Sequence, residues 1–144
     1  MKIFLSHARK DRALASDLAR RLRDQGFTVW LADEEINPGD NWAKKTGKAL
    51  DESERMVILL TPGAMASDWV RSDIEFAISS RKYEARLYSV FVGAAREVGK
   101  HVPWILLKLP HRQVGSAKDF AKVVKDIGDL DALYAKLGMS HANA

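Results

Sequence analysis

The sequence predicts a single α/β domain, in which helices cover both faces of a parallel β-sheet. Short apolar runs alternate along the chain with longer segments whose apolar residues recur every three or four positions, the pattern of strands that alternate with amphipathic helices. The run at 56–60 is apolar at every position, as expected for a central strand that is covered on both sides. No internal repeat, low-complexity tract or linker divides the 144 residues. We therefore expect one domain over 1–144, with a core over 1–127 and a helical extension over 128–144.

The first half of the chain predicts three strands and the helices between them. Asp11 is expected to cap the first helix, because a short side-chain oxygen accepts hydrogen bonds from the unpaired N–H groups of a helix start, and Gly26 ends that helix. The run Asn37–Asp40 has the composition of a loop, and Asp40 or Asn41 is expected to cap the helix that follows. The strands are expected at 3–5, 27–31 and 56–60, and the second helix around 42–50.

The second half predicts two further strands and three helical segments. Ser67 or Asp68 caps the helix after the third strand, and Ser116 caps the last long helix, which Gly128 interrupts. Pro103 starts a short helical turn, since its fixed φ suits the first helical position. The strands are expected at 87–92 and near 113–114, a loop at 93–99, the helices at 67–78, 103–107 and 116–127, and a last turn or short helix at 130–137.

The helix predicted at 67–78 organises the rest of the chain. With 3.6 residues per turn, six of its positions share one face, and five of the six are apolar. The sixth is Asp73, and a carboxylate in an apolar stripe is costly unless it lies at the rim of a cleft or has a partner. Glu75 points away from this face and lies four residues after Arg71, a spacing that suits an exposed ion pair. The five apolar positions are Trp69, Val70, Ile74, Ala77 and Ile78.

The composition excludes several classes of protein. The chain has no cysteine, so it has neither disulfides nor thiolate metal sites, and we expect a cytoplasmic location. No apolar run approaches the roughly 20 residues that span a bilayer, and the start of the chain lacks the features of a signal peptide. The net charge of +4 is mild and spread along the chain, which favours an anionic ligand slightly and a nucleic acid only weakly. We expect neither a nucleic-acid partner nor a membrane partner.

Several kinds of active site are disfavoured by the residues present. Ser6, His7 and Asp11 share one loop without the strained nucleophile turn of a serine hydrolase, so capping, loop or ligand-contact roles are expected for them. The other histidines have no metal-ligand spacing, which predicts no metal site. Neither standard glycine-rich phosphate loop is present. A phospho-accepting signalling domain would need an aspartate where the third strand ends, and that position holds Leu60–Pro62.

Two interpretations stay open for each remaining candidate. Trp42 follows a glycine loop and either packs at the rim of the core or stacks on a planar ring. Arg9 and Lys10 are either a solvated pair or, at the carboxyl ends of the strands where ligands of such folds bind, contacts for a diphosphate. Asp73 is either a buried structural acid or a functional acid that faces a cleft.

Five segments, taken in order, resemble a TIR domain of the bacterial kind. The resemblance runs from Met1 to about Ile127 and thus covers nearly the whole chain. It implies a flavodoxin-like three-layer sandwich with a parallel sheet of about five strands, in agreement with the pattern described above. The segments are Ile3–His7, Gly26–Trp30, Asn37–Asp40, Leu59–Gly63 and Trp69–Ile74.

The resemblance implies two possible activities. Many TIR domains cleave the nicotinamide–ribose bond of NAD+ and give ADP-ribose or cyclic and adenine-containing signals, often in antiphage defence or cell death. Others are adaptors that act through TIR–TIR contacts. The catalytic acid of the enzymes is a glutamate four residues after a tryptophan on the third helix, and counting from Trp69 gives Asp73. The chain thus departs from the family by keeping the charge on an arm that is one methylene shorter.

By the same resemblance, two loops contribute substrate contacts around Asp73. Arg9, on the first loop with Ser6 and His7, would pair with the diphosphate of NAD+. Asp33 and Trp42 flank the second loop: Asp33 would hold a ribose or the loop itself and Trp42 would cover a ring or ribose, with Trp69 beside the acid. Our leading hypothesis is an NAD+ glycohydrolase, or a cyclase or transferase built on the same cleavage, that uses NAD+ as a substrate and needs no resident cofactor. We expect it to self-associate through TIR–TIR contacts and to signal to a separate effector. The rival hypothesis is a non-catalytic TIR adaptor.

Overall fold

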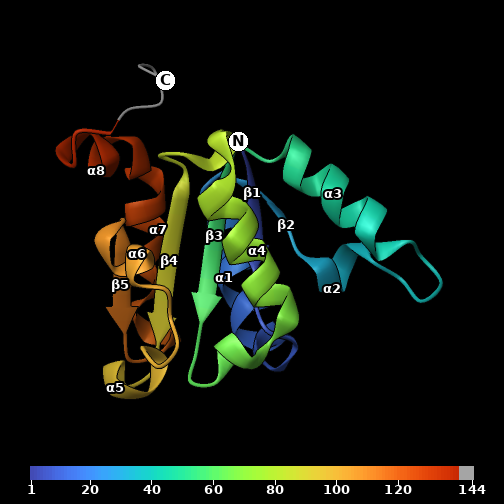
Figure 1. Cartoon of the computed structure of the whole chain (residues 1–144), viewed down its shortest axis with the longest axis horizontal. Coiled ribbons are helices and arrows are strands. Elements are labelled where there is room, and N and C mark those ends of the chain that lie inside the picture. The colour runs from blue at the N-terminus through green and yellow to red at the C-terminus, as the bar shows by residue number, and fades with distance from the viewer. Residues whose placement is uncertain (140–144) are drawn as a thin grey trace.

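A five-stranded parallel sheet forms the centre of the protein. The structure is a computed structural model that describes residues 1–139. The strand order β2-β1-β3-β4-β5 places β3 in the middle of the sheet, as its continuous apolar run predicts (Figure 1). The predicted α/β class and strand count are confirmed, and β2 is shorter than the expected strand. The strands are β1 (Lys2–Ser6), β2 (Thr28–Trp30), β3 (Arg55–Leu60), β4 (Leu87–Val92) and β5 (His111–Val114).

Helices connect the strands and fill both outer layers. The predicted helices are present, together with two four-residue helices that the sequence does not predict, one of which lies in the predicted loop at 93–99. These two, α2 and α5, are too short to display a helical period, so no pattern of apolar residues predicts them. The helices are α1 (Arg12–Asp24), α2 (Ala32–Glu35), α3 (Trp42–Glu52), α4 (Asp68–Ser79), α5 (Ala95–Val98), α6 (Trp104–Lys108), α7 (Phe120–Gly128) and α8 (Leu130–Lys136).

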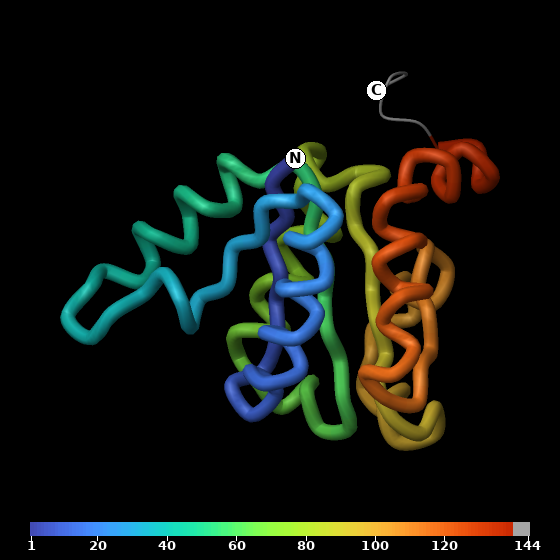
Figure 2. Tube along the Cα trace, turned by 180° about the vertical axis from the view of Figure 1, so that it is seen from behind, coloured from blue at the N-terminus to red at the C-terminus, as the bar shows by residue number. Residues whose placement is uncertain are grey.

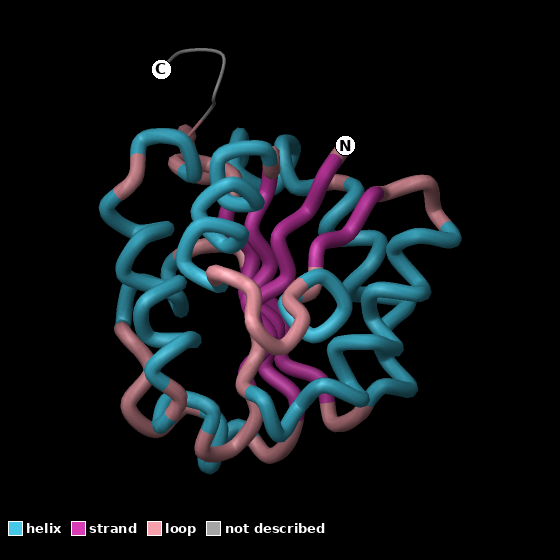
Figure 3. The backbone as a smooth tube through the Cα atoms, turned by 90° about the vertical axis from the view of Figure 1, so that its right-hand side faces the viewer, coloured by secondary structure: helices cyan, strands magenta, loops and turns pink. Residues whose placement is uncertain are grey.

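The sheet separates two apolar cores. On one face α1, α7 and α8 pack against the sheet, and Figure 2 shows α1 and α7 in front of the strands. On the other face lie α3, α4, α5 and α6. Figure 3 shows helices on both sides of the strands, which confirms the three-layer arrangement. Fully buried residues such as Leu18 in α1 and Ile74 in α4 come from the helical faces that the sequence pattern marks as apolar.

The segment after α7 packs closely on the first core. Leu130 and Tyr134 of α8 are buried, and the Tyr134 hydroxyl accepts a hydrogen bond from the N–H of Leu87, at 3.2 Å, and donates one to its carbonyl. The pairing of β4 with β5 starts only at Ser89, so this hydroxyl occupies the place of a missing strand neighbour. The predicted extension therefore has a buried part. Its residues 140–144 lie outside the described part of the chain.

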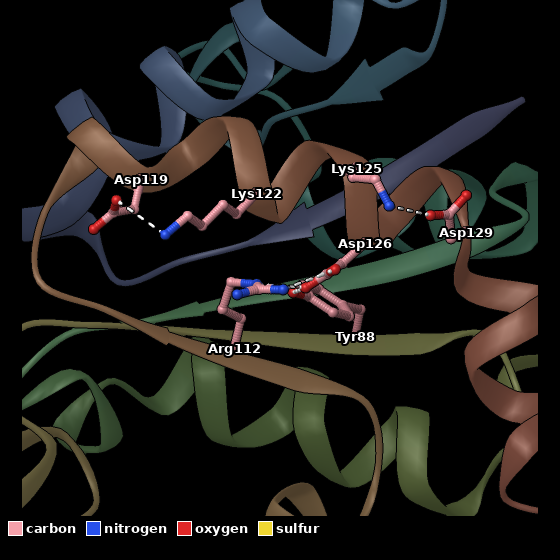
Figure 4. Close-up of polar contacts among 7 residues, drawn as sticks. All are labelled: Tyr88, Arg112, Asp119, Lys122, Lys125, Asp126 and Asp129. Carbon is pink, nitrogen blue, oxygen red and sulfur yellow. Dashed lines mark hydrogen bonds and ion pairs between the residues drawn. The ribbon is translucent and has the colours of Figure 1, made fainter.

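A polar cluster joins α7 to the sheet. Asp126 receives two hydrogen bonds from Arg112, at 2.6 and 3.1 Å, and one from the Tyr88 hydroxyl at 2.6 Å (Figure 4). Burial opposes ionisation of Asp126, but these donors outweigh it and lower the pKa of its carboxyl. The buried guanidinium of Arg55 likewise donates to the last turn of α7 at the carbonyl of Ile127.

The helix caps follow the sequence prediction with one exception. Asn41 caps α3, Ser67 caps α4, and Ser116 caps the short helical turn that leads into α7. The prediction that the side chain of Asp11 caps α1 is wrong, because that carboxylate accepts a hydrogen bond from the Thr61 hydroxyl at 2.6 Å instead. A contact across fifty residues of sequence thus replaces a local one.

Two details of α4 also differ from the prediction. The buried part of the apolar stripe is shorter than expected, because Trp69 and Ile78, near the two ends of the helix, are both more than 40% exposed. Arg71 pairs with Asp68, one turn before it, and donates to the carbonyl of Met65 at 2.8 Å, so the expected ion pair with Glu75 does not form.

The segment from α2 through α3 projects from the β2 edge of the sheet (Figures 1 and 2). Its loop at 36–41 lies at the outer end of this projection, and α3 returns to the core through Ala49 and Leu50. Within residues 1–139, no helix has both the length and the apolar character that crossing a bilayer requires.

Candidate active site

A pocket of about 340 Å³ opens where β1 ends. The order 2-1-3-4-5 reverses direction between β1 and β3, and open α/β sheets bind ligands at that point, beyond the carboxyl ends of the strands. Phe4 and Trp30 from adjacent strands are stacked 4.9 Å apart at its base. The pocket is lined by every residue that the sequence proposes for the site, namely Ser6, His7, Arg9, Asp33, Trp42, Trp69 and Asp73.

Asp73 faces this pocket from the second turn of α4 and is half-buried. The hydroxyl of Ser6, the last residue of β1, donates a hydrogen bond of 2.6 Å to its Oδ2. Burial disfavours the charged carboxylate and raises the pKa of Asp73 to about 6, although the hydrogen bond from Ser6 acts in the opposite direction. The acid therefore has the partner and the cleft that its apolar surroundings predict.

The loop after β1 supplies the basic side of the pocket. The Nδ1 of His7 lies 2.8 Å from the carbonyl oxygen of Ala8, and because a carbonyl only accepts, Nδ1 carries the proton that is donated. Arg9 is exposed and forms no ion pair with any other described residue, so its guanidinium is available to an anion in the pocket. Lys10 points elsewhere and donates to the Thr61 hydroxyl at 2.9 Å. Of the two adjacent cations, only Arg9 belongs to the pocket.

The helix α2 and the loop that follows it form the acidic outer wall. Asp33 is exposed at the pocket mouth. Asp40 folds back to accept hydrogen bonds from the backbone N–H of Asn37 and from Lys45, both at 2.8 Å, and these donors, Lys45 most of all, lower the pKa of its carboxyl. These contacts close the loop at 37–40 into a compact turn beside the pocket.

Two tryptophans at the helix N-termini form the remaining wall. Trp42 begins α3 and Trp69 lies in the first turn of α4, and their rings meet edge to face with centroids 4.2 Å apart. Both indoles are about half exposed, so one side of each remains open to a ligand. Next to them the buried hydroxyl of Thr46 makes no hydrogen bond within the described chain.

A second cavity continues beyond this pair of rings. We name it the α3–α4 groove; its volume is about 460 Å³ and it runs between the two helices. Trp42, Thr46, Trp69 and Asp73 line both the pocket and the groove, so the tryptophan pair and the acid stand between them. The groove is further lined by Ala43, Gly47, Leu50, Asp68, Ser72 and Phe76.

Sequence reasoning did not propose several residues that line the pocket. Asn37 and Asp40 belong to the loop that the composition indicates, but nothing in the pattern shows that this loop folds toward the end of β1. Thr46 lies in the helix predicted around 42–50, and its unpaired hydroxyl could not be foreseen. Ile36 follows α2, a helix that the sequence does not predict.

Comparisons with known proteins identify the family and support the fold. The profile of the family described as TIR domain (TIR_2) matches residues 3–122. A curated relative, the 2' cyclic ADP-D-ribose synthase BtTIR of Bacteroides thetaiotaomicron, is 31% identical over 72 residues, a match that covers 49% of this chain and 25% of the relative.

Solved structures support the same fold. Two structures of a metazoan TIR-STING receptor from C. gigas, one of them in complex with 2',3'-cGAMP, superpose with TM-scores of 0.70 and 0.69 at 18% and 17% identity. The similarity covers 87% of this chain and 38% and 39% of those chains. The matched region is thus between a quarter and two fifths of each relative's length. Since the family profile extends over most of the sequence, the chain belongs to the TIR domain family.

Proposed function

We propose that this TIR domain cleaves the nicotinamide–ribose bond of NAD+ and that Asp73 is its catalytic acid residue. The observation that carries the proposal is the position of Asp73, whose carboxylate accepts a hydrogen bond from Ser6 at the wall of an open pocket that a cation and two aromatic rings also line. The name of the bacterial relative, a cyclic ADP-ribose synthase, supports the same chemistry.

The main catalytic requirement of this reaction is a negative charge held beside the ribose. The bond between C1' of the ribose and the pyridinium nitrogen breaks with its electron pair passing to the nitrogen, so nicotinamide leaves as a neutral molecule. The ribose becomes oxocarbenium-like, and a carboxylate beside it stabilises the developing positive charge and holds the ribose hydroxyls. Water then bonds to C1' and loses a proton, which gives ADP-ribose; a hydroxyl of the same molecule in place of water gives a cyclic product.

The charges around Asp73 suggest the orientation of the substrate. On the side of the tryptophans the cavities carry acids and aromatic rings without a lysine or arginine among the described residues, which suits a pyridinium cation. On the other side Arg9 offers a guanidinium to the diphosphate. A volume of about 340 Å³ is at the small end of ligand pockets, which suits the nicotinamide riboside half, with the adenosine half reaching over the rim.

A direct assay tests the proposal. Purified protein is incubated with NAD+ at high protein concentration and nicotinamide release is followed by chromatography, beside an Asp73→Ala variant. We expect release by the parent protein and only background release by the variant. Equal release by both proteins would remove Asp73 from the mechanism. No release by either would favour the alternative function, a non-catalytic module that acts by TIR–TIR contacts.

The contact between Ser6 and Asp73 predicts the pH dependence of cleavage. The ionised carboxylate is the active form, so activity should fall as pH drops through about 6. In Ser6→Ala the ionised form loses its hydrogen bond, so the pKa of Asp73 rises and the acidic limb of the pH–rate profile should move up by about one pH unit. Ser6→Thr keeps the hydroxyl and should restore the parent profile. An unchanged limb in Ser6→Ala, with activity reduced uniformly, would show that Ser6 does not tune the acid.

A further inference from the structure

One buried side-chain atom in the described chain lacks a hydrogen-bond partner, the hydroxyl oxygen of Thr46 in α3. A threonine inside a helix commonly donates to the carbonyl four residues before it, which here is that of Trp42. Ser53 at the end of α3 and Ser79 at the end of α4 make this kind of bond, at 2.6 and 2.8 Å. The hydroxyl of Thr46 does not, and a buried hydroxyl without a partner destabilises a fold.

Thr46 lies where the pocket and the α3–α4 groove meet. It lines both cavities, and so do Trp42, Trp69 and Asp73. Trp42 stands one turn before Thr46 on α3, so the two side chains share a face of the helix. The adjacent Gly47 leaves space on the groove side, because a Cβ added there would have nothing within 4 Å. The unpaired hydroxyl thus belongs to the wall that the acid, the tryptophan pair and the two cavities share.

The two residues at this point of α3 are unfavourable for stability alone. Thr46 leaves its hydroxyl unpaired, and Gly47 in a helix interior is less favourable than alanine. Alanine has room at position 47, and valine would match the shape of Thr46 without the hydroxyl. Residues that lower stability where simple replacements exist are typical of functional sites. This pattern indicates a ligand contact.

The surroundings of Thr46 indicate which chemical group its hydroxyl can bind. A hydroxyl both donates and accepts hydrogen bonds, and so does a primary carboxamide, through its NH₂ group and its carbonyl oxygen. The indoles of Trp42 and Trp69 suit a planar ring that carries such a group. The charged residues of the groove are the acids Asp68 and Asp73, which disfavour a carboxylate in the same position. An uncharged amide on an aromatic ring fits this wall best.

We propose that Thr46 is a specificity-determining residue whose hydroxyl binds the carboxamide of the nicotinamide group. The assignment rests on the proposed function, since NAD+ is the substrate that brings this ring to Asp73. Binding the carboxamide satisfies a hydroxyl that folding leaves unpaired. An analogue without the carboxamide leaves it unpaired, so the site selects against that analogue. A carboxylate in place of the carboxamide would in addition face the charge of Asp73.

A binding experiment tests the assignment without turnover. Free nicotinamide and pyridine, which lacks the carboxamide, are titrated into the parent protein and Thr46→Val, and tryptophan fluorescence reports binding beside Trp42 and Trp69. The parent should prefer nicotinamide to pyridine. In Thr46→Val the ratio of the two dissociation constants should fall by about tenfold, the effect of losing one hydrogen bond. Thr46→Ser keeps the hydroxyl and should keep the preference. An unchanged preference in Thr46→Val would overturn the assignment.

Thermal unfolding of the free proteins provides a matched pair of threonines. Thr46→Val removes an unpaired hydroxyl and should raise the melting temperature by about 4 °C. Thr61→Val removes a hydroxyl that donates to Asp11 at 2.6 Å, so it should lower the melting temperature. A loss of stability in Thr46→Val equal to that in Thr61→Val would show that the fold itself uses the hydroxyl of Thr46, and would count against a role reserved for a ligand.

Turnover separates this assignment from the proposed function. Cleavage of NAD+ is compared with that of deamido-NAD+, in which a carboxylate replaces the carboxamide. The parent should favour NAD+ in kcat/KM, and Thr46→Val should reduce that preference by about tenfold. Nicotinamide binding that depends on Thr46, in a protein that does not cleave NAD+, would contradict the proposed function and support the contact. Cleavage that depends on Asp73, with the parent's preferences kept in Thr46→Val, would support the function and refute the contact.

Discussion

Asp73→Asn is expected to lower the rate of NAD+ cleavage by about a hundred- to a thousandfold and, at neutral pH, to make the protein more stable. The native carboxyl has a pKa of about 6, raised from 3.8 by burial. It therefore binds a proton more tightly than the unfolded chain does, and stability falls as pH rises from about 4 to about 6. Above about pH 6 the buried carboxylate is ionised, and the folded state bears the full free-energy cost of that charge. Two pKa units at 1.36 kcal/mol each, discounted for partial exposure, give about 1–3 kcal/mol.

Urea unfolding at several pH values measures this gain in stability. Asparagine has nearly the shape of aspartate and still accepts the hydrogen bond from Ser6, so it removes the charge without creating a cavity. The difference in the free energy of unfolding should be largest near neutral pH and should vanish below about pH 4, where the parent carboxyl is protonated in both states. Asp33→Asn, at the exposed pocket mouth, serves as the control and should leave stability within about 0.5 kcal/mol of the parent. A variant less stable than the parent at neutral pH would mean that the Asp73 carboxylate serves the fold.

Tyr134→Phe is expected to destabilise the domain by about 3 kcal/mol, although it removes one oxygen atom. That hydroxyl both accepts from the N–H and donates to the carbonyl of Leu87, at a point where β5 has not yet begun to pair with β4. Phenylalanine leaves both backbone groups buried without partners, and each such group costs about 1–3 kcal/mol. Denaturant unfolding should show a lower midpoint with an unchanged slope.

Tyr88→Phe is the matched control. The Tyr88 hydroxyl donates to Asp126, which keeps both hydrogen bonds from Arg112 after the change, so the loss should be only about 1 kcal/mol. Equal losses in the two variants would indicate that water reaches Leu87 in Tyr134→Phe and that α8 does not seal the edge of β4.

The sequence pattern predicted the strands of the sheet but not the short helices in the connections between them. The first four strands are marked by apolar or β-branched runs, whereas β5 is mostly polar. The run of β3 identified the centre of the sheet because only a doubly covered strand is apolar throughout. The helices α2 and α5 were not predicted, because four residues complete barely one helical turn and show no period. Ile78 was expected to be buried because helical spacing shows which residues share a face, whereas the exposure of a helix end depends on where its neighbours stop.

The candidate site was predicted in part for a related reason. The acid in an apolar stripe indicated that Asp73 needs a cleft or a partner, and it has both. Its partner could not be identified, because Ser6 is 67 positions away in the chain and only the placement of α4 beside the end of β1 brings the two together. Asp11 illustrates the opposite failure, since a local capping rule was overridden by a distant threonine.

The tryptophan pair in the wall of the pocket gives this domain its own optical reporter. Two indoles held edge to face with centroids 4.2 Å apart couple their electronic transitions, so the folded protein should display a pair of circular dichroism bands of opposite sign. Any event that parts or reorients Trp42 and Trp69 would change those bands without an added dye. The conformation of the pocket wall can therefore be followed by spectroscopy in dilute solution, apart from any measurement of turnover.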